Sequence, residues 1–183
     1  GMKIAIIDTG LDIDHQNFAP LSEDKLTDTS ADKSTVAAVL DSLNATSRFE
    51  GLTADDLYYN TKVVYGFNYC DDNLNVTHDY DNKGDHGTHV AGIIAGKDDT
   101  ITGVAVDAQL AIMKVFSDSK EGAEDGDILA ALEDCVILGV DVINMSLGTA
   151  CGFSRESDEE QISGVYDKIR AQGISLVVAA SNS

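Results

Sequence analysis

The chain has 183 residues, of which 43% are hydrophobic, so it is long enough and apolar enough to fold as one globular domain. Asp and Glu outnumber Lys and Arg by 32 to 12, and the resulting net charge of −20 argues against binding to nucleic acid or to acidic membrane surfaces. The sequence contains no signal peptide, and no apolar run approaches the roughly 20 residues that a membrane-spanning helix needs, so we expect no membrane insertion.

The first predicted element is a buried strand over residues 3–7, a short run rich in β-branched side chains. The segment Asp8-Thr9-Gly10 ends it with a charge and a flexible residue. Asp8 would therefore lie at the carboxyl end of a strand, where open α/β sheets place their ligands and their chemistry. Taken alone, an aspartate in this position is more often a residue that caps a turn.

A polar segment over about residues 21–59 interrupts the pattern of regular elements. It contains many Asp and Ser residues and only short apolar stretches, such as residues 36–40. We expect a surface excursion that carries a short helix. Two interpretations remain open, because such a segment can shape a binding cleft or be an insertion that the fold tolerates without functional effect.

The next elements are a strand over residues 62–67 and a helix over residues 86–95. Val90, Ile93 and Ile94 give this helix an apolar side, and the small residues Gly92 and Gly96 allow close backbone approach. His86 falls in its first turn. A single histidine there is usually structural, but a histidine base needs a carboxylate that fixes its tautomer, and Asp8 is the natural partner.

The remaining chain alternates regularly between strand-like and helix-like segments. We predict strands over residues 110–115, 140–144 and 175–179, and helices over residues 127–138 and 159–171. Apolar residues at positions 128, 129, 132 and 136 and at 162, 165 and 169 give the two helices core-facing stripes. This alternation predicts an α/β fold with a parallel sheet, right-handed crossovers and helices on both faces.

The three cysteines are Cys70, Cys135 and Cys151. Their spacing fits no metal site, and their odd number leaves one unpaired in any disulfide scheme. We expect free thiols, with Cys135 buried on its helix.

Four segments together resemble the subtilisin-like serine proteases, the subtilase or peptidase S8 family. They are Ile-Ala-Ile-Ile-Asp-Thr-Gly at 4–10, Asp-His-Gly-Thr-His-Val-Ala-Gly at 85–92, Val-Ile-Asn-Met-Ser-Leu-Gly at 142–148 and Val-Val-Ala-Ala-Ser-Asn at 177–182. The phrases at 63–69, 107–110 and 114–117 are most similar to the lactocepin and C5a-peptidase-like cell-envelope proteases of Gram-positive bacteria. The resemblance spans almost the whole chain.

This resemblance implies a three-layer fold and a serine endopeptidase whose triad runs in the order Asp, His, Ser. Asp8 would orient the histidine and His86 would be the general base. Asn182 matches the asparagine that donates to the oxyanion. The resemblance also implies no organic cofactor, and a protein that is secreted or attached to the cell envelope.

The same resemblance assigns substrate binding to Ser146, Leu147 and Gly148. These residues would form the backbone edge beside which an extended protein or peptide substrate lies, by β-augmentation. Ser146 belongs to that edge and is therefore not a candidate nucleophile.

The family's nucleophile lies well beyond the asparagine, whereas this sequence stops at Ser183. We expect residues 1–183 to be the N-terminal portion of a catalytic domain, inactive alone and completed by the missing C-terminal part of the same polypeptide. Asn17, in His15-Gln16-Asn17, stands where relatives often carry a calcium-binding aspartate, and the segment 97–102 is short for the rest of that site. We do not expect the usual strong calcium site.

Two other functions are compatible with the sequence. Histidines and carboxylates crowd one stretch and could bind zinc, although the His-Glu-x-x-His spacing is missing; they are His78, Asp79, Asp81, Asp85, His86 and His89. The chain could also be a noncatalytic peptide-binding module that keeps the cleft without a nucleophile.

Overall fold

The computed structural model describes residues 1–77, 84–148 and 156–180, with the backbone alone for 156–162. Within these residues, five strands form one parallel sheet in the order β2-β3-β1-β4-β5. The strands are β1 (Lys3–Asp8), β2 (Val63–Asn68), β3 (Gln109–Lys114), β4 (Val142–Met145) and β5 (Ser175–Val178). The predicted α/β fold with a parallel sheet is confirmed, and β1 is its central strand.

Strand boundaries differ from the predicted ones by one or two residues, because some apolar or extended residues belong to turns. Val140 is buried, but its N–H donates to the carbonyl oxygen of Cys135 across a turn (3.2 Å) and not into the sheet. Lys62 likewise donates its backbone N–H to the Asn60 side chain (2.8 Å). Both residues were predicted to begin strands, and both precede them.

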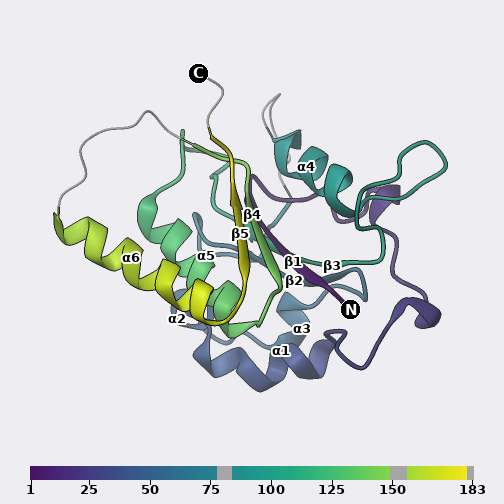
Figure 1. The fold of residues 1–183 in the computed structure, drawn as a ribbon, viewed down its shortest axis with the longest axis horizontal. Helices are drawn as coiled ribbons and strands as arrows, with labels where there is room; N and C mark the ends of the chain where they lie inside the picture. The colour runs from purple at the N-terminus through teal and green to yellow at the C-terminus, as the bar shows by residue number, and fades with distance from the viewer. Residues whose placement is uncertain (78–83, 149–155, 181–183) are drawn as a thin grey trace.

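Helices cover both faces of the sheet, which gives the expected three layers (Figure 1). One face packs on α4 (Asp85–Ala95), and the other on α5 (Asp125–Ile137), α6 (Glu156–Ala171) and the short helices α1 (Lys33–Val39), α2 (Asn44–Arg48) and α3 (Ala54–Leu57). Short 3₁₀ turns lie at Gln16–Phe18, Glu23–Lys25 and Leu40–Ser42. On α5 and α6 the predicted stripes supply Leu132, Val165 and Ile169 to the core.

The buried side of α4 consists of small residues. Gly87, Ala91 and Ala95 are its buried residues, whereas Ile93 has 56% of its surface exposed. Small residues four positions apart let the helix backbone lie close to the sheet, so the larger side chain is left on the outer side. Of the three apolar residues noted in the sequence, Val90 and Ile94 pack against the core and Ile93 lies on the outer side.

The segment 21–59 is more than a surface excursion. It forms α1 to α3, and Val36, Leu43 and Leu57 are buried in the same core cluster as the sheet and α5. Asp134 of α5, itself fully buried, accepts hydrogen bonds from the backbone N–H groups of Asn44 (2.6 Å) and Ala45 (3.1 Å) and so caps α2. Burial raises the pKa of this carboxyl above its ordinary value.

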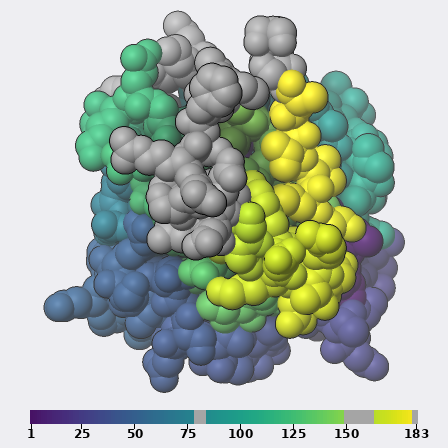
Figure 2. Space-filling model, turned by 60° about the vertical axis from the view of Figure 1, so that its left-hand side comes forward, coloured from purple at the N-terminus to yellow at the C-terminus, as the bar shows by residue number. Residues whose placement is uncertain are grey.

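The edge strand β5 is exposed along one side of the molecule. Val177 and Val178 keep 53% and 49% of their surface exposed, and β5 lies beside α6 on the face shown in Figure 2. Cys70 and Cys135 are free thiols and Cys135 is fully buried, as predicted, whereas Cys151 lies outside the described residues. Among the described helices, none is long and apolar enough to cross a membrane.

Candidate active site

Asp8 is the last residue of the central strand, so the sheet places it at the edge where the carboxyl ends of all five strands meet. Only 1% of its surface is exposed. Oδ1 accepts a hydrogen bond from the Thr9 backbone N–H (2.7 Å). Oδ2 is buried and has no hydrogen-bond partner among the described residues, so a positive charge nearby would stabilise the carboxylate.

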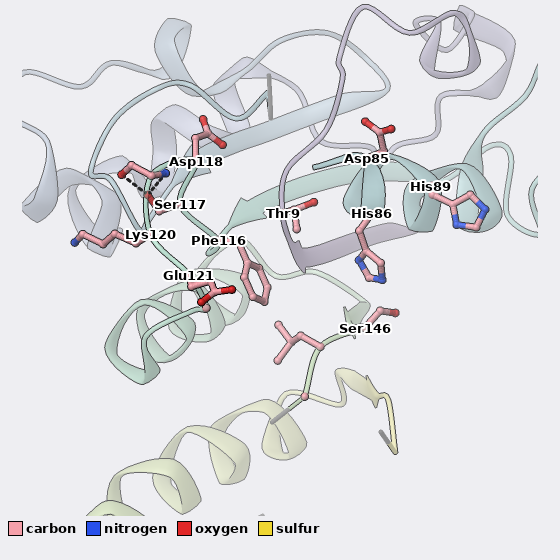
Figure 3. Close-up of a pocket in the computed structure, with 14 residues that line it drawn as sticks. Thr9, Asp85, His86, His89, Phe116, Ser117, Asp118, Lys120, Glu121 and Ser146 are labelled. Atoms are coloured by element: carbon pink, nitrogen blue, oxygen red, sulfur yellow. Dashed lines mark hydrogen bonds between the residues drawn. The ribbon is translucent and has the colours of Figure 1, made fainter. Parts of the chain in front are cut away.

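His86 supplies the group that faces this carboxylate. It is the second residue of α4, and its Nδ1 lies 2.8 Å from Oδ1 of Asp8. The imidazole side chain is 51% exposed and projects into a cleft (Figure 3). Because Nδ1 is engaged by Asp8, Nε2 is the ring nitrogen left to act on a molecule in the cleft.

Thr9 holds the first turn of α4 against the end of β1. Its Oγ1 accepts from the backbone N–H of Gly87 (2.9 Å) and donates to the carbonyl oxygen of Gly84 (3.0 Å). Gly87 is required here, because a Cβ at this position would lie only 2.2 Å from the carbonyl oxygen of Gly10. These contacts fix the helix position, and with it the distance between His86 and Asp8.

The cleft beside His86 has a volume of about 960 Å³ and two walls. One wall is the loop that follows β3, and the other is the segment that follows β4. The lining residues are Thr9, Asp85, His86, His89, Phe116, Ser117, Asp118, Ser119, Lys120, Glu121, Gly122, Ser146, Leu147 and Gly148. None of them comes from the segment 21–59, so the structure does not support a direct role for that segment in shaping this cleft.

Ser146, Leu147 and Gly148 line the cleft directly after β4, and Ser146 lies below His86 in the view of Figure 3. The Oγ of Ser146 accepts a hydrogen bond from Nδ2 of Asn144 (3.0 Å). This position is compatible with the edge that the sequence predicts. The hydroxyl contact gives Ser146 a local structural partner.

Asn182 and Ser183 lie outside the described residues, as do His78, Asp79 and Asp81. In the part of the chain that the structure describes, no group of three or more His, Cys, Asp or Glu residues could hold a metal ion. His86 and His89 leave α4 in different directions (Figure 3). The zinc interpretation therefore has no support from the described residues.

Asn17, the residue at the position of the calcium-binding aspartate of relatives, is buried, and its Oδ1 has no partner among the described residues. The small pocket beside it is also lined by Lys25, Lys62, Lys97 and Asp107, and Asp107 pairs with Lys25 (3.2 Å). An amide in place of a carboxylate, with three lysines and one carboxylate that already pairs with a lysine, is a poor ligand set for a calcium ion. The lack of a strong calcium site stays a prediction.

Two contributors to the site were not predicted from the sequence. The motif analysis treats Thr9 only as part of a strand end, and Lys114 only as part of a family phrase. Lys114 ends β3 in register with Asp8 and is fully buried. A charged residue that ends an otherwise apolar strand was the signal that could have drawn attention to it.

Comparison with known proteins decides the family. The model of the Subtilase family (Peptidase_S8) matches residues 1–183. The chain belongs to the subtilase family. Over 191 aligned residues it is 37% identical to the PII-type proteinase of Lactococcus lactis subsp. cremoris, and over 190 it is 30% identical to the C5a peptidase of Streptococcus pyogenes serotype M3.

These alignments include all of this chain but only 9% and 15% of the two subtilase relatives. Among solved structures, the protease domain of PatA aligns with a TM-score of 0.60 at 23% identity, covering 99% of this chain and 50% of that one. A lanthipeptide protease aligns with a TM-score of 0.61, also at 23% identity, over 99% of this chain and 39% of that one. At this level of identity the two structures show a shared fold.

Proposed function

We propose that this chain supplies the acid–base pair and one substrate edge of a serine endopeptidase. The observation that carries the proposal is the 2.8 Å contact between Nδ1 of His86 and Oδ1 of Asp8 at the wall of an open cleft. A buried carboxylate fixes the tautomer of the imidazole and stabilises its protonated form. Family membership supports the same chemistry.

In the proposed mechanism, Nε2 of His86 takes the proton of a serine hydroxyl while that oxygen attacks the carbonyl carbon of a peptide bond. The resulting imidazolium is stabilised by Asp8 and then donates its proton to the leaving amine. Asn182 would donate a hydrogen bond to the oxyanion. No serine in the 183 residues matches the family's nucleophile segment, so we propose that the nucleophile belongs to a segment outside this sequence.

The substrate is proposed to be an extended segment of a protein or peptide. Ser146 to Gly148 present a backbone edge on one side of the cleft, and residues 116–122 form the opposite wall. An extended chain between them can form hydrogen bonds along the edge while its scissile bond lies beside His86. For the parent protein we propose a secreted or envelope-attached location, supported by the resemblance to cell-surface proteases of Gram-positive bacteria.

The experiment joins the chain to the downstream coding sequence of its gene and measures cleavage of oxidised insulin B chain, a general protease substrate. We expect hydrolysis that His86→Ala abolishes. Asp8→Asn should lower turnover by about ten-thousandfold, the loss known for the same change in another serine protease. Asn182→Ala should lower it by about a hundredfold to a thousandfold, a figure measured on subtilisin, a member of this family.

The alternative function is a noncatalytic peptide-binding module. It would be favoured by saturable binding of the insulin B chain without turnover. Hydrolysis that survives His86→Ala at the wild-type rate would contradict the proposed role of the histidine.

A further inference from the structure

Lys114 is a buried cation beside the proposed catalytic pair. It ends β3 opposite Asp8 in the sheet register, and none of its surface is exposed. Its Nζ donates to the carbonyl oxygens of Thr9 (2.8 Å) and Phe116 (2.6 Å) and to Oδ1 of Asp118 (3.0 Å). Burying an ammonium group costs free energy unless such partners surround it, so this position demands a cation that donates several hydrogen bonds.

The described partners of Lys114 belong to two structures that border the cleft. Thr9 is joined through its hydroxyl to Gly84 and Gly87 at the start of α4, the helix that carries His86. Phe116 and Asp118 lie in the wall formed by the loop after β3. One buried side chain therefore joins the support of the imidazole to the wall that faces a bound peptide.

The wall is also braced from its outer side. Ser117 donates its hydroxyl to Oδ1 of Asp71 (2.7 Å) and contacts the hydroxyl of Ser119 (3.0 Å). This brace connects the wall to Asp71, in the segment that follows β2. Lys114 instead connects the wall to Thr9, and through Thr9 to the helix of His86.

We propose that Lys114 is a positioning residue that sets the gap between His86 and the wall formed by residues 116–122. This inference rests on the proposed function and names a residue that governs how firmly the cleft holds a peptide. Lys114 bonds the backbone carbonyl of Thr9, whereas the hydroxyl of Thr9 holds α4. The hydroxyl contacts remain when Lys114 is replaced, so we expect the loss to fall mainly on peptide binding and much less on proton transfer.

The experiment uses the protein joined to its downstream segment, with oxidised insulin B chain as substrate. Lys114→Met keeps the length of the side chain and removes its donors. We expect KM to rise about tenfold, the effect of losing roughly one charge-assisted hydrogen bond in the wall, with a much smaller change in kcat. In the 183-residue chain, the Kd for the same peptide, labelled with fluorescein, should rise by a similar factor.

The matched control is Lys62→Met. Lys62 is also buried and its Nζ donates to two carbonyl oxygens, those of Val106 (2.7 Å) and Ala108 (2.9 Å), but these partners do not line the cleft, whereas Thr9, Phe116 and Asp118 do. If Lys114 only stabilises the fold, both variants lower the melting temperature and neither changes KM. An unchanged KM in Lys114→Met, or a loss confined to kcat, would overturn the inference.

Asp118→Ala tests the same link from the wall side, where the residue is partly exposed and the change should not prevent folding. We expect Asp118→Ala to raise KM less than Lys114→Met does, and Asp118→Asn to leave KM near the wild-type value. Combining Asp118→Ala with Lys114→Met should raise KM no further than Lys114→Met alone. Fully additive effects would show that the two residues act separately and would contradict the link. If the protein shows no His86-dependent hydrolysis but still binds the peptide in a way that depends on Lys114, the proposed function is wrong. The role of Lys114 in peptide binding would then still stand.

Discussion

The two residues of the proposed acid–base pair differ sharply in exposure. Asp8 is 1% exposed, whereas the side chain of His86 is 51% exposed. The carboxylate is thus fixed by the sheet, and the imidazole is free on the side that faces the cleft. Such an arrangement lets one group hold the tautomer while the other exchanges protons with a bound molecule.

At the scale of single residues, Thr9 gives a testable prediction. Thr9→Val keeps the shape of the side chain but removes the hydroxyl that bonds Gly84 and Gly87. The free energy of unfolding in urea should fall by about 1–3 kcal/mol, because a partly buried N–H and a carbonyl lose their partner. Thr102→Val, at an exposed position, is the matched control and should change stability little.

An equal loss of stability in the two variants would contradict the role given to Thr9.

Sequence patterns could predict that Asp8 and His86 meet, because each lies in a recognisable motif. They could not predict the contacts of Thr9 or Lys114, because these depend on strand register and on where α4 begins. Such details arise only when residues about 75 to 105 positions apart are packed together.

At the scale of elements, the position of α4 on the sheet decides the geometry of the site. The helix approaches the loop after β1 so closely that Gly87 faces the backbone of Gly10. Gly10 itself has φ of +119° and would place a Cβ 2.2 Å from the carbonyl oxygen of Val76. Two glycines thus bring the histidine helix against the aspartate strand.

Two glycines of the same helix give a matched test. Gly87→Ala should lower the free energy of unfolding by about 1–3 kcal/mol, because the added methyl group must push α4 away from Gly10. A Cβ at Gly92 meets nothing within 4 Å, so Gly92→Ala should leave stability unchanged or raise it by up to about 1 kcal/mol. If urea unfolding gave the reverse order, the position assigned to α4 would be wrong.

Strands and helices were largely predictable because their apolar patterns are strong. The face of α4 was not, since its larger apolar residues do not reveal that the helix packs most closely through Gly87 and Ala91. The prediction for the segment 21–59 was also incomplete. Its few apolar residues, such as Val36 and Leu57, are buried by contacts with distant strands, and local polarity hides this.

At the scale of the whole molecule, the dominant property is the net charge of −20. Twelve Lys and Arg residues cannot pair with 32 acidic residues, so most carboxylates face others of the same sign across the surface. Two of the basic residues, Lys62 and Lys114, are buried and donate hydrogen bonds to backbone oxygens. Repulsion between surface carboxylates should therefore destabilise the compact state.

Screening by salt should relieve this repulsion. Between about 10 mM and about 150 mM NaCl the screening length falls from roughly 30 Å to roughly 8 Å. We expect the melting temperature at neutral pH to rise over this range, measured by circular dichroism. Choline chloride at equal ionic strength should produce the same rise, whereas an effect confined to sodium would indicate ion binding and contradict the screening explanation.

The most direct test of the account is the tautomer of His86, measured by ¹⁵N NMR on the 183-residue chain at a pH where the ring is neutral. The contact with Asp8 predicts a proton on Nδ1 and a bare Nε2. Asp8→Asn should shift the proton toward Nε2, because an amide can donate to Nδ1. A proton on Nε2 in the wild-type chain, or spectra that Asp8→Asn leaves unchanged, would contradict the pairing on which the proposed function depends.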